Sequence, residues 1–402
     1  MASSARPSSG PASQVRLLAF VALLSALVLT SLGTGASSLT QAASAADTDS
    51  QPRYEVWQRA EAPYDENRSN PLANRVWGVY QGPQDQLWRR YQKVSPARQA
   101  RLDTIALRPR TKWYGSFVAD RSIRSTVRSY IASSQAGDPD KLVQIAVFRM
   151  EPWEHAACKK RTTAKQKKSY KRWIVQLAAG IGATPTLVVM QPDGPFLWCA
   201  PDRRKKAKLL AWATKRLSAL PRTSVYIDAG AADWCENDKG ADPERCAGIL
   251  KQTGIAHARG FALDSTHYTG PSENIRHGAR IVQILKRDGY GTKHFIIDTA
   301  KSGRPTPWSQ MIPSRKGGAK DDARVCRSRT MTRCVALGIP PTVRVADERY
   351  GLSADDRVLA KQLVDGFVWF GRPWLYMQAD PFVLKRGLAL ADNTPWPGPK
   401  RD

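Results

Sequence analysis

The stretch TLVVMQPDGPFLWC (residues 186–199) joins an apolar run of strand character to a Pro-Asp-Gly turn. Aspartate and glycine are common in the turn that follows a strand, so Asp193 alone has an ordinary structural explanation. The same order recurs in TSVYIDAGAADW, ARGFALDSTHY and KHFIIDTAKSG, which carry Asp228, Asp264 and Asp298. Successive aspartates are 35, 36 and 34 residues apart, a period that fits a unit of strand, loop, helix and return loop.

The segments between these strands have the spacing of amphipathic helices. Residues 206–220 and 273–289 both place apolar side chains at helical intervals. Alternating strands and helices predict a parallel sheet, and continuous apolar strands predict burial on both faces. We therefore predict a single α/β domain built as a closed or nearly closed TIM-like βα barrel. An open doubly wound sheet is the alternative, although no Gly-rich dinucleotide fingerprint follows any strand.

Side chains at the carboxyl ends of barrel strands converge on one mouth, which predicts that these aspartates share a cleft. Repulsion and burial raise the pKa of at least one carboxyl group in such a cluster. A protonated carboxyl beside ionised neighbours is what glycoside hydrolysis requires. Thirteen tryptophans are present, and those near strand ends, including Trp113, Trp234 and Trp369, are candidates for stacking on a sugar. For any one tryptophan, core packing is the simpler interpretation.

Other chemistries find less support in the sequence. The five histidines are scattered without an H-x-H or H-E-x-x-H pattern, so we predict no catalytic metal. A G-x-S-x-G elbow, which a Ser-His-Asp hydrolase of the α/β type would use, is absent from the sequence.

The first 46 residues have the order of a secretory signal peptide. Arg6 and Arg16 precede the apolar run LLAFVALLSALVL, and the small-residue tract QAASAA follows it. We predict cleavage near residue 46 and secretion, with a retained membrane anchor as the less favoured alternative. Residues 47–69 would then form an N-terminal extension, and residues 70–395 the barrel domain.

Six cysteines in an exported chain predict three disulfides. The close pairs Cys235/Cys246 and Cys326/Cys334 would each staple one loop, which leaves Cys158 with Cys199. Six cysteines allow about 15 pairings, so this connectivity stays open.

The formal net charge is +27, with Lys/Arg clusters at 159–172, 203–208 and 324–333. Such a surface attracts anionic polymers non-specifically. General solvation of exposed faces is the simpler interpretation of each cluster. No helix-turn-helix, ribonucleoprotein or zinc-finger pattern accompanies the charge, so we predict no specific nucleic-acid partner.

Several segments resemble, in order, those of glycoside hydrolase family 6, a family of secreted β-1,4-glucanases and cellobiohydrolases. VYIDAGAADW resembles the family's YLDAGHAGW, QPDGPF its EPDSL, GFALDSTHY its GFALNVSNY and FIIDTAKSG its FVIDTSRNG. NPLANRVWGVY, CVALGIPPT and VDGFVWFGRP resemble further family segments, so the similarity covers about residues 70 to 390.

The resemblance implies a distorted βα barrel, no cofactor, and hydrolysis by single displacement with inversion. Asp193 matches the family's general acid, Asp228 the carboxylate that lines its site, and Trp234 its sugar platform. The family also joins two cysteines at the places of Cys158 and Cys199, in agreement with the pairing above.

This chain departs from the family's pattern at several site positions. Ala157 stands where the family has an aspartate that raises the pKa of the acid, and Glu151 or Glu154 is a possible substitute. The family's base segment is replaced by GRPWLYMQAD, in which Arg372 and Asp380 supply the charges. The predicted substrate-binding residues are Trp113, Trp234, Asp264, His267, Trp369 and Arg372.

The sequence thus predicts a secreted, monomeric glucanase that hydrolyses a β-1,4-linked glucan or related polysaccharide, with Asp193 as the general acid. The alternative is a catalytically weak protein that binds an anionic cell-wall polymer in the same cleft.

Overall fold

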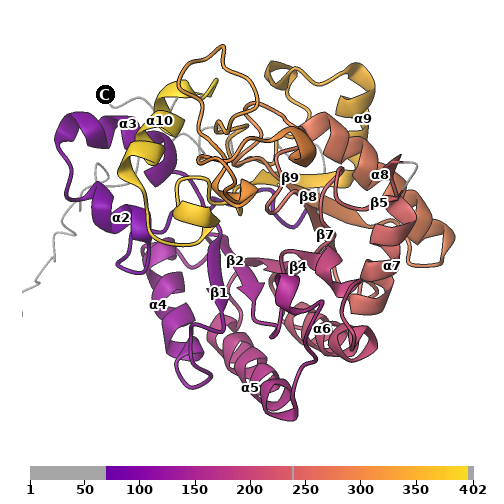
Figure 1. Cartoon of the computed structure of the whole chain (residues 1–402). Coiled ribbons are helices and arrows are strands. Elements are labelled where there is room, and N and C mark those ends of the chain that lie inside the picture. Colours follow the sequence, from indigo (N-terminus) through magenta and orange to yellow (C-terminus); the bar gives the residue numbers. More distant parts are fainter. Residues whose placement is uncertain (1–68, 238–239, 397–402) are drawn as a thin grey trace, which may run out of the picture. The chain divides into compact units, whose positions relative to one another are not determined.

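The computed structural model describes residues 69–237 and 240–396 (Figure 1). The predicted signal peptide, and all of the predicted N-terminal extension except Ser69, lie outside the described residues. The proposed domain limits therefore stay a prediction.

Seven parallel strands form one curled sheet, and neighbouring strands follow one another along the chain (Figure 1). In spatial order they are β1 (Lys112–Gly115), β2 (Val143–Phe148), β3 (Thr186–Met190), β4 (Thr223–Asp228), β7 (Gly260–Leu263), β8 (His294–Asp298) and β9 (Val364–Val368). A separate hairpin pairs β5 (Glu236–Asn237) with β6 (Gly240–Ala241). The parallel barrel predicted from the strand-to-aspartate repeat is confirmed in this curled, distorted form.

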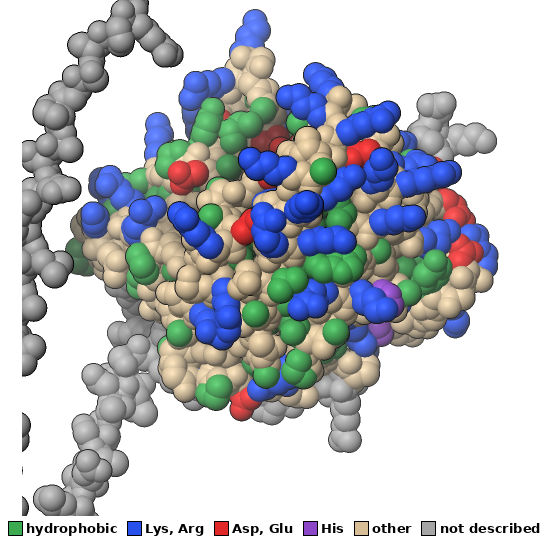
Figure 2. Space-filling view, turned by 90° about the horizontal axis from the view of Figure 1, so that it is seen from below, with side chains coloured by type: hydrophobic (Ala, Val, Ile, Leu, Met, Phe, Trp, Pro, Cys, Tyr) green, Lys and Arg blue, Asp and Glu red, His purple; other side chains and the backbone are tan. Residues whose placement is uncertain are grey.

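Helices cover the outside of the sheet and connect consecutive strands, as right-handed βα crossovers require (Figure 1). Those on the described residues are α2 (Gln86–Tyr91), α3 (Pro96–Ala106), α4 (Ile123–Gln135), α5 (Ala164–Ile181), α6 (Arg203–Ser218), α7 (Pro243–Thr253), α8 (Pro271–Arg287), α9 (Ala354–Leu363) and α10 (Leu384–Asn393). The helices predicted at 206–220 and 273–289 correspond to α6 and α8. Seen from below Figure 1, Lys and Arg side chains project over the whole face, in keeping with the net charge of +27 (Figure 2).

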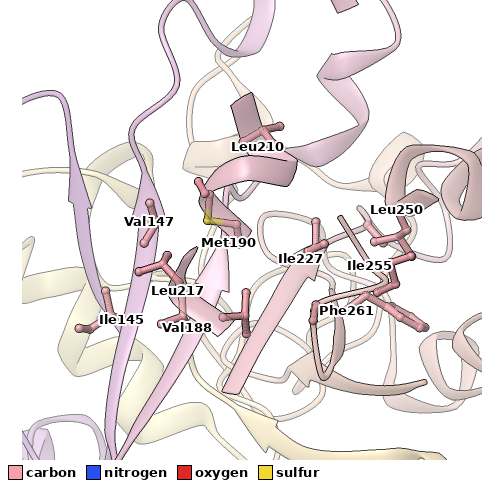
Figure 3. Packing of buried hydrophobic residues seen from close by; sticks show 14 of the residues in the cluster. Ile145, Val147, Val188, Met190, Leu210, Leu217, Ile227, Leu250, Ile255 and Phe261 are labelled. Carbon is pink, nitrogen blue, oxygen red and sulfur yellow. The ribbon is translucent and has the colours of Figure 1, made fainter. Parts of the chain in front are cut away.

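Side chains alternate between the two faces of the sheet and build two separate cores. Inward-facing residues fill the barrel, among them Ala146, Val189, Tyr226, Ala262, Ile296 and Val368. Their neighbours in sequence point outward and pack under the helices, where Val188 and Ile227 join Leu210 and Leu217 of α6 (Figure 3). Each fully buried aliphatic side chain stabilises the fold by roughly 1.5–3 kcal/mol. The burial of both faces explains why these strands are apolar without alternation.

The barrel is incompletely closed between its first and last strands. Among the described residues, no ladder of hydrogen bonds joins β1 to β9. Two contacts bridge the gap instead: the Thr111 N–H donates to the Trp369 carbonyl at 2.9 Å, and the Trp113 indole N–H to the Phe370 carbonyl at 2.7 Å. This opening leaves one side of the barrel lined by loops.

A buried polar cluster ties the amino-terminal end of the barrel together. The Asp365 carboxylate is fully buried and accepts a bidentate pair of hydrogen bonds from Arg259 at 2.8 and 2.9 Å. The Tyr226 hydroxyl donates to the same carboxylate at 2.7 Å. The Asn70 amide reaches the Asp365 carbonyl at 2.8 Å, which anchors the start of the described chain to β9.

The three predicted disulfides are confirmed: Cys158–Cys199, Cys235–Cys246 and Cys326–Cys334. The first joins the loops that follow β2 and β3, and the other two each staple one short loop. In the described ranges, no helix combines the length and apolar character of a membrane span.

Replacing Asp365 by alanine is predicted to lower the free energy of unfolding by about 3 kcal/mol, because a buried hydrogen-bonded ion pair is broken. The loss is held to this size because the Arg259 side chain is 24% exposed, so water can reach it. Tyr226→Phe removes one hydrogen bond and is predicted to cost about 1 kcal/mol. Denaturant unfolding measures the free energy of unfolding of both variants. Equal losses would show that the ion pair with Arg259 adds nothing beyond the hydrogen bond from Tyr226.

Candidate active site

Four aspartates meet at the carboxyl ends of four adjacent strands. Asp193 follows β3, Asp228 ends β4, Asp264 follows β7 and Asp298 ends β8. All four are buried, with exposed fractions of 4% for Asp193 and 0% for the others. The predicted convergence is therefore present, although the four carboxylates differ in their partners.

Asp298 is committed to an internal ion pair with Lys301, and both side chains are fully buried. The Lys301 ammonium also donates to the carbonyls of Asp264 at 2.9 Å and Ser265 at 3.1 Å. The Asp298 carboxylate accepts the Phe370 N–H at 3.0 Å, so it links the ends of β8 and β9. Asp298 thus positions the mouth of the barrel.

Asp264 shapes the loop after β7. Its backbone is left-handed, with φ of 70°, and its N–H donates to the Gly230 carbonyl at 2.7 Å. One carboxylate oxygen accepts the Thr269 hydroxyl at 2.7 Å. Burial raises the pKa of Asp264 well above its usual range. The predicted substrate contact of this residue stays a prediction.

Asp228 is held by backbone donors from two loops. Its Oδ1 accepts the N–H groups of Gly194 at 2.9 Å and Gly230 at 3.1 Å. Burial raises the pKa of Asp228 to about 7, although the backbone donors, the Ser265 hydroxyl and the charge of Lys301 act in the opposite direction. A Cβ at position 194 would lie 2.2 Å from the Asp228 carbonyl oxygen, which explains the glycine of the Pro-Asp-Gly turn.

Asp193, in the loop after β3, is another buried carboxyl with a raised pKa beside Asp228. Its backbone is left-handed, with φ of 65°, and its Oδ1 accepts the Thr266 hydroxyl at 2.9 Å. Burial first, and then the nearby charges of Asp228 and Glu154, raise the pKa of Asp193 well above its usual range. Asp193 therefore keeps its proton under conditions in which an exposed carboxyl loses it, and it can act as a proton donor.

A row of aromatic rings borders these carboxyl groups. The His267 imidazole is stacked between the indoles of Trp234 and Trp308, with 4.5 Å between ring centroids on each side. Asp233 fixes this stack, because it pairs with His267 Nδ1 at 2.7 Å and accepts the backbone N–H of Trp308 at 2.6 Å. Phe196 meets Trp234 edge-on at 5.4 Å. One face of the predicted sugar platform Trp234 is thus covered by His267.

Arg372 lies in the same cleft. Burial lowers the pKa of Arg372 to about 9, and the charges of Asp193 and Asp380 act in the opposite direction. Its guanidinium lies over the Trp113 ring, 4.1 Å from the centroid. This contact brings the predicted residues Trp113 and Arg372 together. Two of the predicted tryptophans are buried, with exposed fractions of 7% for Trp113 and 1% for Trp369, and each indole N–H donates to a backbone carbonyl. Trp369 packs in the core and offers a sugar no surface, and Arg372 covers the ring of Trp113.

The two glutamates considered as substitutes at the site have different surroundings. The Glu151 carboxylate pairs with Arg149 at 2.8 Å. Burial and the charge of Asp321 raise the pKa of Glu154, although its side chain is exposed. The charge of Glu154 in turn raises the pKa of Asp193, whereas the Glu151 carboxylate is ion-paired with Arg149.

Asp233 and Trp308 of the aromatic row, and also Thr266, Lys301 and Asp321, escaped the sequence analysis. Thr266 and Lys301 lie inside the quoted segments GFALDSTHY and FIIDTAKSG, so their nearness to the aspartates was visible in the sequence but not their contacts. Asp321 lies in a polar loop far along the chain, and its charge raises the pKa of Asp193 and Glu154. No spacing in the sequence connects that loop to the site. Among the described residues, no group of histidines, cysteines and acids is suited to hold a metal ion.

The sequence profile of the family described as Glycosyl hydrolases family 6 matches residues 76–351. A 228-residue segment is 30% identical to endoglucanase A of Cellulomonas fimi, covering 56% of this chain and 47% of that protein. A 231-residue segment is 28% identical to endoglucanase 1 of Streptomyces halstedii, covering 54% of this chain and 68% of that protein. The chain thus spans about half the length of the first of these relatives and two thirds of the second.

Solved structures with the same architecture include the endoglucanase Cel6 from Mycobacterium tuberculosis, in complex with a thio-linked cello-oligosaccharide. It has a TM-score of 0.61 and 23% identity, over 81% of this chain and 99% of that one. Endoglucanase CEL6B from Humicola insolens has a TM-score of 0.56 and 15% identity, over 81% of this chain and 98% of that one. At these identities the likeness establishes the shared fold.

The raised pKa of Asp228 predicts a pH-dependent cost to stability. Between pH 4 and pH 7 the folded chain holds a proton on Asp228 that the unfolded chain has released, so stability falls as pH rises through this window. Asp228→Asn cannot titrate and still accepts both backbone donors through Oδ1. Its Tm relative to wild type should therefore increase from pH 4 to pH 7 and stay level above it. Asp140 is exposed and Arg222 lowers its pKa, so the Tm of Asp140→Asn relative to wild type should show no such increase. If the Tm of Asp228→Asn relative to wild type does not change with pH, the raised pKa of Asp228 is contradicted.

Proposed function

The chain belongs to glycosyl hydrolase family 6, and on that premise we propose that it hydrolyses the O-glycosidic bonds of a β-1,4-linked glucan or a related polysaccharide. The observation that carries the proposal is the pair of buried carboxyl groups at the barrel mouth. Asp193 is biased toward its protonated form, and the neighbouring Asp228 titrates near neutrality. Two carboxyl groups with different proton affinities are the chemical requirement of glycoside hydrolysis.

In the proposed reaction Asp193 is the general acid. Its carboxyl proton moves to the glycosidic oxygen as the bond between that oxygen and the anomeric carbon breaks. The Thr266 hydroxyl donates to Asp193 Oδ1, which leaves Oδ2 as the oxygen that carries the proton. The backbone at Asp193 is left-handed, and its carboxyl meets Thr266 in the loop after β7.

A water molecule attacks the opposite face of the anomeric carbon in this mechanism, which inverts its configuration. The attacking water must lose a proton, and Asp380 is our candidate for accepting it, directly or through other waters. Asp380 is exposed to solvent and its charge interacts with Arg372, which also interacts with Asp193. Asp228 is assigned a supporting role, since two backbone donors engage its Oδ1 and its charge raises the pKa of Asp193.

Glu154 and Asp321 together are proposed to replace the aspartate that the family has at position 157. Both carboxylates raise the pKa of Asp193, which is the effect that the missing residue would have had. Glu154 comes from the loop after β2 and Asp321 from the loop that precedes Cys326, so this substitution combines two segments distant in sequence. The site therefore retains the electrostatic condition for a general acid.

We assign sugar binding to the aromatic row and to Arg372. Because His267 covers one face of Trp234, the remaining ring edges and the outer rings of the row supply the contact surface. Secretion is proposed with the function: three disulfides in a chain of this size are typical of an oxidising compartment.

Asp193→Asn is predicted to lower kcat on a soluble β-1,4-glucan by about 10²- to 10⁴-fold, because proton donation is lost. On 2,4-dinitrophenyl cellobioside, whose leaving group needs no proton, the loss should be small. Reducing-sugar release and dinitrophenolate absorbance measure the two rates, and proton NMR of fresh products should show the α anomer first.

Asp140→Asn, an exposed change far from the site, is the matched control and should keep full activity. Equal losses on both substrates would remove Asp193 from the role of acid. A folded wild-type protein that cleaves no β-glucan would overturn the proposed function.

Glu154→Gln and Asp321→Asn are each predicted to move the alkaline limb of the kcat/KM profile to lower pH. The reason is that each carboxylate raises the pKa of Asp193, so its removal lets the acid lose its proton earlier. The double variant should move the limb further. Glu151→Gln is the control, since the Glu151 carboxylate is paired with Arg149, and its profile should match wild type. A shift in the control alone would refute the assignment.

A further inference from the structure

A group of exposed cations lies beside the candidate active site, at the amino-terminal ends of α5 and α6. We call it the basic rim; its members are Lys159, Lys160, Arg161, Lys165, Arg204 and Lys205. The loop after β2 carries Glu154 and leads into α5, and the loop after β3 carries Asp193 and leads into α6. The basic rim is thus built on the same two loops as the acid and its neighbour.

The two halves of the basic rim are fixed to each other. The Cys158–Cys199 disulfide joins the loops, with 4.6 Å between the Cα atoms. Beneath it, the Lys206 ammonium is fully buried and donates to the Thr162 hydroxyl and to Asp202, both at 2.7 Å. The other Asp202 oxygen accepts the Thr162 N–H at 2.9 Å. These contacts hold the rim as a rigid surface.

Beyond Glu154, the segments that carry the basic rim contain almost no acids. Residues 155–172 contain no Asp or Glu, and residues 194–216 contain only Asp202, which is buried and paired with Lys206. In the part of the chain that the structure describes, no rim side chain forms an ion pair.

Helix stability does not explain these cations. The amino-terminal end of a helix carries partial positive charge and favours acids, yet the first turns of α5 and α6 contain none. Cations there oppose the helix dipole. Lys215 and Arg216, in the last turn of α6, occupy the favourable end. The basic rim therefore costs local stability, which points to a ligand.

We propose that the basic rim binds the negatively charged substituents of the polysaccharide whose β-1,4-linked backbone occupies the cleft. The preferred substrate is then an anionic glucan rather than a neutral one. This inference rests on the proposed function, because it extends the same substrate chain beyond the site. Carboxylate groups spaced along such a chain meet cations spaced along the rim.

A polysaccharide suits the basic rim better than a single-stranded nucleic acid. Binding of single strands requires exposed aromatic rings on which bases stack. The exposed large apolar side chains of the described residues are Phe117, Val358 and Tyr376, and none belongs to the rim. Trp198, the nearest indole, is covered by the guanidinium groups of Arg203 at 4.8 Å and Arg245 at 5.3 Å.

The test compares soluble carboxymethyl β-1,4-glucan with its neutral hydroxyethyl counterpart. For the rim variant Arg204→Gln/Lys205→Gln, KM on the carboxymethyl polymer at low salt should rise by about three-fold or more, with KM on the neutral polymer unchanged. Added salt should remove the difference between wild type and variant. Lys159→Gln/Lys160→Gln should behave in the same way.

Lys215→Gln/Arg216→Gln is the matched control, since it removes one Lys and one Arg from the other end of the same helix. Its KM values should equal those of wild type. The helix dipole predicts that Tm is unchanged or higher for the Arg204/Lys205 variant and unchanged or lower for the control. Equal KM changes in the two variants would overturn the proposal.

Affinity electrophoresis in gels that contain each polymer reads binding without catalysis. If the carboxymethyl polymer retards the wild type and not the rim variant, the inference is supported, even when no hydrolysis is detected. Absence of hydrolysis would contradict only the proposed function. Equal retardation of the wild type by both polymers would overturn the inference about the basic rim. A rim variant that no longer binds single-stranded DNA but still binds the carboxymethyl polymer would also overturn this inference.

Discussion

The hydrogen bonds from the Gly194 and Gly230 backbone to Asp228 Oδ1 hold the candidate active site together. They connect the loop after β3 to the end of β4, so they set where the Asp193 carboxyl lies. The close approach leaves no room for a side chain at position 194. A buried carboxylate is costly unless it is hydrogen-bonded, and these donors let Asp228 remain where no solvent reaches it.

The same burial that requires those donors gives the site its chemistry. Removed from water, Asp193 and Asp228 both hold protons more tightly, and the charge of Asp228 raises the cost of ionising Asp193 further. Elsewhere at the barrel mouth the same problem has another solution, because the Asp298 carboxylate is paired with the buried ammonium of Lys301. The strands of the barrel mouth thus carry two kinds of carboxyl group: Asp193 and Asp228 have raised pKa values, whereas Asp298 forms a structural ion pair.

The loops that bring these carboxyl groups together also carry the basic rim, and the Cys158–Cys199 disulfide serves both. It fixes the segment that holds Glu154 relative to the segment that follows Asp193. In this arrangement the carboxyl groups lie in the cleft with Arg372 beside them, and the exposed cations of the basic rim lie outside it. A polysaccharide with acidic substituents matches that division, since its backbone and its substituents meet different surfaces.

The sequence by itself determined the barrel, because a strand that ends in aspartate every 34 to 36 residues is a local pattern that each βα unit repeats. It also predicted the three disulfides and the aspartates at the mouth. The helices α4 and α7 were not predicted, although their apolar side chains recur at helical spacing, and the four-residue strand β1 is too short to show a period. Tertiary structure alone decided that Trp369 is core, that His267 covers Trp234, and that Asp321 reaches Asp193. Burial and long-range charge depend on which distant segments meet, and no spacing along the chain records that.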